Sequence, residues 1–207
     1  MKFLSLLLIV AVLGTTVFLG FYFYSRLQRY EVPSQAGNEI VPEATECVPT
    51  FADGGGPYYK PTAPFREVLV DEGADGEPLT VRGKILLNDC KTPVTNAVLD
   101  IWQANASGSY EDEWYRGKVR TDDEGNYAFT TVVPKGYGEG TGYRPPHIHF
   151  KVFVNDTEII TSQMFFPEVK GREGFNDAYI MELESTTTAN GKHHKGYHDI
   201  ILPLSSI

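Results

Sequence analysis

Two histidines separated by one residue are the first feature of this sequence that could do chemistry. His147 and His149 lie in a segment rich in β-branched and aromatic residues, directly after Pro145 and Pro146. Side chains alternate between the two faces of a strand, so both imidazoles would project from one face. Two imidazoles on a rigid backbone supply half of a metal site. A pair of hydrogen-bonded or surface histidines has the same spacing, so periodicity alone leaves both interpretations open.

Tyrosines before the histidine pair indicate what could complete such a site. Phenolate is a hard anionic ligand that suits ferric iron better than zinc or calcium, and only a strong Lewis acid ionises a phenol of pKa about 10 at neutral pH. Two phenolates and a hydroxide would neutralise a 3+ ion, and two neutral imidazoles would complete five-coordination. Because tyrosine is also an ordinary strand residue, ferric iron is one hypothesis among several. The tyrosines that precede the pair are Tyr110, Tyr115, Tyr127, Tyr137 and Tyr143.

The rest of the chain predicts an all-β domain that would hold these side chains. Short segments rich in β-branched and aromatic residues are separated by Gly, Asn, Asp and Pro, and none has the period of a long amphipathic helix. We expect an antiparallel β-sandwich at residues 57–207, after a linker and lead-in at 25–56. Strands are expected at 79–87, 97–103, 127–133, 147–154, 159–166 and 199–204.

The amino terminus is a separate hydrophobic segment. Residues 3–24 are uncharged and long enough, at about 1.5 Å per residue, to cross a bilayer as a helix; residues 21–24 are aromatic, as is common at a membrane interface. We expect a hydrophobic helix outside the sandwich, with residues 1–24 forming a transmembrane anchor; a cleaved signal segment is the alternative. The domain would be exported and membrane-anchored, or secreted after cleavage. Basic residues flank both ends of the run, so charge leaves the orientation open.

Composition argues against nucleic acid as a partner and leaves open whether the two cysteines form a disulfide. The formal net charge is −9 and no basic cluster is present, so nucleic acid is not expected as a partner. Two cysteines, Cys47 and Cys90, are too few for a disulfide scaffold. They would pair in an exported domain and remain buried thiols in a cytosolic one. Sequons at Asn105 and Asn155 are available for glycosylation in a eukaryotic host.

Three ordered motifs resemble those of the intradiol ring-cleavage dioxygenases, the family of protocatechuate 3,4-dioxygenase and catechol 1,2-dioxygenase. Residues 99–110 (LDIWQANASGSY) resemble the strand and first tyrosine ligand, 134–137 (PKGY) the turn with the second tyrosine, and 144–150 (RPPHIHF) the segment with both histidines. Segments 47–59 and 88–94 resemble the opening of the catalytic domain and the turn before the tryptophan strand. The resemblance covers roughly residues 45–207.

The resemblance implies a metal site and a reaction. It implies four ligands of one Fe(III) ion: Tyr110, Tyr137, His147 and His149. Tyr137 resembles the axial ligand that leaves when substrate binds, whereas Arg144 and Gln163 match residues beside the bound ring. The implied reaction inserts both atoms of O2 into a catechol and opens the ring between its hydroxylated carbons, giving a muconate-type diacid. Catechol, protocatechuate and hydroxyquinol all stay open as substrates, as does oligomerisation.

The chain departs from the family pattern in two places. The stretch between Tyr110 and Thr121 is short and acidic, which leaves the pocket wall and the ring substituent undetermined. A hydrophobic segment stands where catechol 1,2-dioxygenases have a helical dimerisation region, and this fits the exported branch of the family. Two other interpretations are a catalytically idle metal-binding relative and a prealbumin-like β-sandwich binding module.

The remaining aromatic and histidine residues are assigned mainly structural roles. Tyr115, Tyr127 and Tyr143 are expected to pack rather than to bind a metal, and Tyr58 and Tyr59 either line the pocket or pack elsewhere. A second histidine group, with Gly and Lys between its members, is predicted to lie in an exposed loop rather than to form a metal cluster: His193, His194 and His198.

Overall fold

The computed structural model describes residues 47–170, 176–189, 191–204 and 207. The predicted hydrophobic segment at 3–24 lies outside these residues, so the division into anchor, linker and domain stays a prediction. In the part of the chain that is described, no helix is long and apolar enough to cross a membrane. Apart from strands, that part contains short 3₁₀ turns at Gly140–Gly142, Pro167–Val169 and Asp177–Tyr179.

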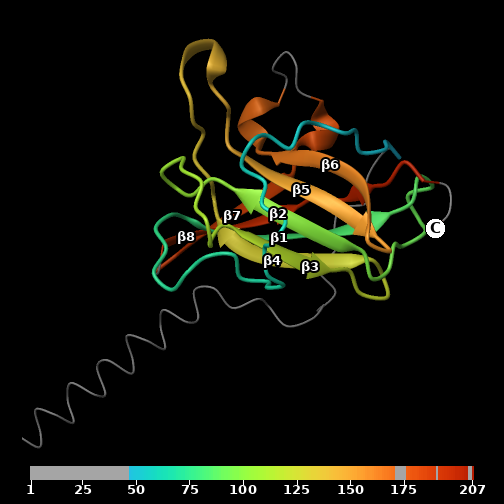
Figure 1. The fold of residues 1–207 in the computed structure, drawn as a ribbon. Helices are drawn as coiled ribbons and strands as arrows, with labels where there is room; N and C mark the ends of the chain where they lie inside the picture. Colours follow the sequence, from blue (N-terminus) through green and yellow to red (C-terminus); the bar gives the residue numbers. More distant parts are fainter. Residues whose placement is uncertain (1–46, 171–175, 190, 205–206) are drawn as a thin grey trace, which may run out of the picture. The chain divides into compact units, whose positions relative to one another are not determined.

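The described strands form two sheets, and the all-β sandwich expected from the sequence is confirmed (Figure 1). The strands are β1 (Pro78–Leu86), β2 (Val98–Gln103), β3 (Arg116–Arg120), β4 (Asn126–Val132), β5 (His147–Val154), β6 (Thr157–Phe165), β7 (Glu182–Thr188), β8 (Gly191–Tyr197) and β9 (Ile200–Ile201). One sheet has the order β4-β1-β8-β7 with β9 beside β1, and the other has the order β3-β2-β5-β6. Pairing is antiparallel except where β8 and β9 run parallel to β1.

The core lies between the sheets because one face of each central strand is apolar. In β1, every second residue is buried, and Leu79, Val81 and Ile85 are fully so. Ile148 and Phe150 of β5 belong to the same buried cluster. The apolar face of β5 thereby fixes the strand's orientation, and its histidines must face away from the core.

Three strands that the sequence did not predict are polar: β3, β7 and β8. β3 and β7 lie at sheet edges, where alternation of polar and apolar residues is weak. The prediction of an exposed loop for the second histidine group is wrong, because His193 and His194 lie in β8 and both His194 and His198 are buried. His194 Nδ1 lies 2.8 Å from Ser185 Oγ and Nε2 lies 2.7 Å from Glu77 Oε2, so this polar side chain is satisfied within the sheet.

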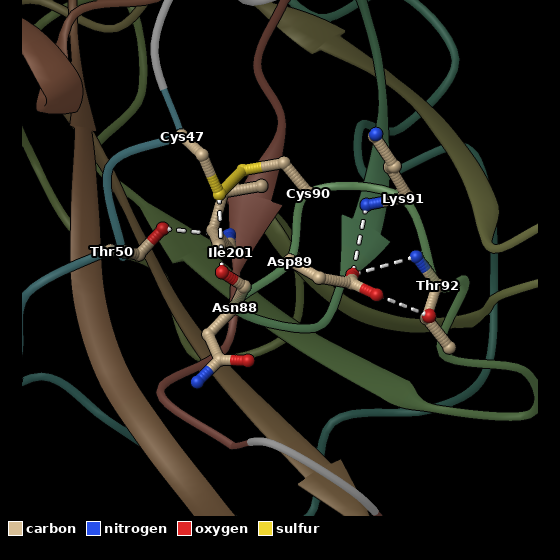
Figure 2. The surroundings of a disulfide bond; sticks show 8 residues. All are labelled: Cys47, Thr50, Asn88, Asp89, Cys90, Lys91, Thr92 and Ile201. Atoms are coloured by element: carbon tan, nitrogen blue, oxygen red, sulfur yellow. Dashed lines mark hydrogen bonds between the residues drawn. A yellow bond between two sulfur atoms is a disulfide. The ribbon is translucent and has the colours of Figure 1, made fainter.

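A disulfide anchors the chain where it enters the domain. Cys47 and Cys90 are joined across a sequence separation of 43 (Figure 2), which decides between the two alternatives left by the sequence. Thr50 then pairs with Ile201, through a backbone bond and through its hydroxyl, each at 2.9 Å. Residues 47–59, here called the lead-in segment, are therefore held from their first residue onward.

Candidate metal centre

Strand β5 places His147 and His149 side by side. Their Nε2 atoms lie 3.1 Å apart, and each residue is only 2% exposed. His147 Nδ1 lies 2.6 Å from the carbonyl oxygen of Pro145. A carbonyl can only accept, so Nδ1 carries the proton and Nε2 presents its lone pair to the space beside His149. The strand thus directs a nitrogen donor to one point, as the one-residue spacing predicts.

Two tyrosines approach the same point from loops outside the strand. Tyr110 Oη lies 3.4 Å from His147 Nε2. The Tyr137 ring centroid is 5.6 Å from those of both Tyr110 and His147, and its ring stands edge-on to that of Tyr110. The structure therefore brings together the four residues that the sequence assigns to a metal.

Hydrogen-bonded turns hold these tyrosines in place. Asn105 Oδ1 accepts bonds from two backbone N–H groups of the turn that leads to Tyr110, at 2.9 and 3.0 Å. The backbone of Tyr137 pairs with that of Arg144 through bonds of 3.0 and 2.8 Å. These bonds close the base of the β4–β5 connection, which projects from the end of the sandwich in yellow and orange (Figure 1). The Tyr137 ligand candidate and the Arg144 substrate-side candidate are therefore set by one loop.

Burial shifts the pKa values of His147, His149 and Tyr110. It lowers the pKa of both imidazoles, that of His149 to about 3, and the nearby charge of Arg144 acts in the same direction. Burial also raises the pKa of the Tyr110 phenol, and the hydrogen bond with Tyr137 adds to this. The space between these side chains is thus surrounded by neutral imidazoles and a protonated phenol. Ionising that phenol at neutral pH requires a strong cation beside it.

This donor set fits a ferric ion. Two imidazole nitrogens and two phenol oxygens are a mixed set of borderline and hard ligands, and the phenolates would neutralise part of a 3+ charge. Among the described residues, no group of three or more His, Cys, Asp or Glu could hold a metal ion. An ion bound at the histidine pair would therefore depend on the tyrosine oxygens.

The two residues predicted to lie beside a substrate ring contact each other. Arg144 Nη2 donates to Gln163 Oε1 at 2.7 Å. Gln163 is 1% exposed and lies opposite His149 in the β5–β6 pairing. Arg144 also contributes to the pKa shifts of His147, His149 and Tyr110, which places its charge close to the four residues.

Two aromatic rings and the lead-in segment form a wall of the site. The sequence left open whether Tyr58 lines the pocket or packs elsewhere, and it assigned no such role to Trp102 or Gly56. Tyr58 stacks on Tyr110 with centroids 4.1 Å apart and planes 10° apart, and Trp102 of β2 stacks on His149 at 4.9 Å. Gly56 has φ +63°, and a Cβ there would lie 3.6 Å from the His149 ring. The sequence signal for this wall was the glycine-rich run before Tyr58, which indicates a turn but no contact partner.

The other tyrosines lie elsewhere. Tyr59 Oη donates to the buried carboxylate of Asp100 at 3.0 Å, and Tyr127 Oη donates to His198 O at 2.5 Å. Tyr115 is buried, whereas Tyr143 is 49% exposed. None of these four rings is placed among the four residues of the candidate centre.

Comparison with known proteins gives a consistent family. A family model described as "Dioxygenase" matches residues 55–182. Catechol 1,2-dioxygenase 2 of Acinetobacter lwoffii is 33% identical over 171 residues, covering 70% of this chain and 58% of that protein. The protocatechuate 3,4-dioxygenase beta chain of Burkholderia cepacia is 34% identical over 155 residues, covering 61% of this chain and 65% of its own length. The chain thus spans less than two thirds of the length of each of these two relatives.

Solved structures agree with the family model. The dioxygenase domain of a dioxygenase and carbohydrate-binding fusion protein from Streptomyces sp. SirexAA-E superimposes with a TM-score of 0.65 at 32% identity, over 76% of this chain and all of that domain. The 3-chlorocatechol 1,2-dioxygenase of Rhodococcus opacus 1CP, at 24% identity and a TM-score of 0.66, shares the fold. The resemblance drawn from the three sequence motifs is confirmed, and the chain belongs to the intradiol ring-cleavage dioxygenase family.

Proposed function

We propose that this protein is a non-haem Fe(III) dioxygenase that cleaves catechol-type diols between the two hydroxylated carbons. The observation that carries the proposal is the convergence of Tyr110, Tyr137, His147 and His149 on one buried point. Family membership supports it independently of that geometry. A catalytically idle relative would share both features, so activity has to be measured.

The four residues would hold the ion through two phenolate oxygens and two Nε2 atoms. The Pro145 carbonyl already holds His147 in the tautomer that a metal requires. When bound, the ferric ion supplies Lewis-acid activation of the catechol oxygens. Adding O2 to the ring and breaking one carbon–carbon bond gives a muconate-type diacid that contains all atoms of both reactants.

The protein's own groups would bind the ring and move its protons. We infer that Tyr137 Oη, as the phenolate, accepts a proton from a catechol hydroxyl, since the backbone of Tyr137 pairs with that of Arg144, the candidate cation beside the ring. Arg144, held by Gln163, would face the negative charge that develops on the ring. Trp102 and Tyr58 stack on the rings of His149 and Tyr110, and this would fix the orientation of both donor side chains.

The charges around the site favour a catechol without a carboxylate substituent. Arg144 is a cation that acts on the pKa values of His147, His149 and Tyr110, and its guanidinium is already bonded to Gln163. Gln163 is in turn bonded to the Asp53 carboxylate, which would repel a second carboxylate. We therefore propose catechol or hydroxyquinol, rather than protocatechuate, as the preferred substrate class.

The disulfide supports the proposed export of the domain. Disulfides persist in oxidising compartments and are rare in the cytosol, and Cys47–Cys90 lies at the start of the domain. We propose an exported domain that is tethered by residues 3–24, or secreted if that segment is cleaved.

The experiment is oxygen uptake by the purified, iron-loaded protein with catechol, hydroxyquinol and protocatechuate. We expect about one iron per chain, a visible tyrosinate-to-iron band, and uptake that is fastest without the carboxylate. Tyr110→Phe should weaken both the band and turnover sharply, whereas the matched control Tyr143→Phe, at an exposed ring, should change neither. Iron and colour without uptake would indicate an idle relative; no iron would indicate a binding module.

A further inference from the structure

We propose that Asp53 is a positioning residue that aims the Arg144 guanidinium at the substrate ring by fixing the amide of Gln163. The inference rests on the proposed function of the site. Gln163 Nε2 donates to Asp53 Oδ2 at 2.8 Å and more weakly to Gly54 O at 3.3 Å. Its Oε1 accepts from Arg144 Nη2 at 2.7 Å. A hydrogen-bonded chain therefore runs from the lead-in segment through a buried amide to the arginine.

The Asp53 carboxylate matters because an amide side chain has two ends of nearly equal size. An ionised carboxylate can only accept, so it selects the orientation in which Gln163 turns its NH2 group toward Asp53. The oxygen then faces Arg144, which can only donate. In the flipped orientation, two donors would meet at Arg144 and two acceptors would meet at Asp53. The charged ends of the chain thus determine the orientation of its neutral centre.

Asp53 is itself held in place by the strand that carries Gln163. Its backbone N–H donates to Thr161 O at 2.9 Å, and its Oδ1 accepts from Gly54 N at 2.7 Å. The residue before Gln163 on β6 makes a second such bond: Ser162 Oγ donates to the backbone carbonyl of Phe51 at 2.8 Å. The lead-in segment is therefore hydrogen-bonded along β6, and the carboxylate is positioned before any substrate arrives.

Arg144 needs such a support because it lies in an exposed part of the β4–β5 loop. Among the described residues, Gln163 Oε1 is the acceptor of its guanidinium. An arginine without a fixed partner samples many rotamers, and ordering it during the reaction would cost entropy. Asp53 and Gln163 reduce that cost in advance. No sequence pattern predicts this role, because Asp53 lies 110 residues before Gln163.

The test compares Asp53→Ala, Asp53→Asn and the matched control Ser162→Ala in the full, iron-loaded protein. Ser162→Ala removes a neighbouring tether of the same segment but leaves the Gln163 amide alone. We expect Asp53→Ala to lower kcat for catechol about tenfold with KM within about twofold, because the lost support acts on charge that develops in the transition state. Asp53→Asn keeps an acceptor oxygen and should recover most of the activity. Iron content and the tyrosinate band should stay unchanged in all three variants.

Two further measurements separate positioning from general loosening. In a double-mutant cycle, Asp53→Ala should add little to Gln163→Ala, since both break one chain. Crystal structures of wild type and Asp53→Ala should show the Arg144–Gln163 contact present in the first and lost in the second. An unchanged contact, an additive cycle, or an equal loss in Ser162→Ala would overturn the proposal. If wild type cleaves no catechol, the proposed function fails, and the crystallographic contact still decides whether Asp53 positions Arg144.

Discussion

Removing the disulfide would show how firmly the lead-in segment is held over the site. The bond between Cys47 and Cys90 closes a loop with a sequence separation of 43. In the chain-entropy model, a loop of this length stabilises the folded state by about 4 kcal/mol at 25 °C. Without the bond, the first anchor of the segment is the pair of hydrogen bonds between Thr50 and Ile201. For a domain of this size, the loss corresponds to a fall in Tm of roughly 8–16 °C.

The assay is urea denaturation and thermal melting of the double variant Cys47→Ser/Cys90→Ser beside wild type, each with and without reductant. Reduced wild type should match the double variant, and the double variant should not respond to reductant. We also expect kcat/KM to fall more than iron content, because Tyr58 and Asp53 are carried by the loosened segment whereas His147 and His149 are not. A loss of stability below about 1 kcal/mol would refute the reasoning, since the Thr50 anchor would then suffice.

Three further predictions follow from single residues. Gly56→Ala should lower iron occupancy, measured by metal analysis, because an alanine is strained at φ +63° and relieving that strain would move the backbone that packs beside the His149 ring. Gly54→Ala, where a Cβ meets nothing within 4 Å, is the control. Burial lowers the pKa of His198 to about 4, so between pH 6.5 and about 4 the unfolded state binds a proton that the folded state does not. Lowering the pH through this window should therefore reduce the free energy of unfolding by roughly 3 kcal/mol. In urea titrations at several pH values, His198→Leu should remove this contribution to the pH dependence of the free energy of unfolding. Expressed through a eukaryotic secretory pathway, the protein should carry a glycan on the exposed hairpin residue Asn155 and none on Asn105, whose amide is bonded to Ser107, Ser109 and Glu111. The measurement is the mass shift that a glycosidase causes in wild type, Asn155→Gln and Asn105→Gln. Loss of the shift in Asn105→Gln alone would contradict the prediction.

The strands that could be predicted from the sequence are those with an apolar face. β1, β2, β4, β5 and β6 were predicted to within a few residues, because they are rich in β-branched and aromatic residues and are bounded by turn formers. In β1, alternating burial also leaves a period of two in the sequence. β3 (RGKVR), β7 (ELESTTT) and β8 (GKHHKGY) leave no such period. They are polar strands whose pairing depends on neighbours distant in sequence, as with the parallel partner β1 of β8. Their existence could not be read from local composition.

The residues of the candidate centre could likewise be predicted only in part from strand geometry. His147 and His149 could be placed together because they share one strand, whereas Tyr110 and Tyr137 were assigned through family motifs rather than through geometry. The contacts made by the lead-in segment had no local signal: Tyr58 on Tyr110 and Asp53 on Gln163 join residues about 50 and 110 positions apart. Such contacts depend on the path of a segment without strand periodicity, and a disulfide fixes the start of that path.

Strand register explains why these pieces act as one site. Trp102, His149 and Gln163 lie directly opposite one another on β2, β5 and β6, so one row across three strands carries an indole ring, a candidate metal donor and the candidate substrate-side amide. A slip of one residue between β5 and β6 would turn Gln163 toward the core and leave its amide unpaired in an apolar environment. The apolar residues Ile160 and Met164 of β6 prevent that slip, because they would have to leave the core at the same time. The packing that stabilises the sandwich is therefore also what holds the candidate metal donors in register with Gln163, and through Gln163 with Arg144 and Asp53.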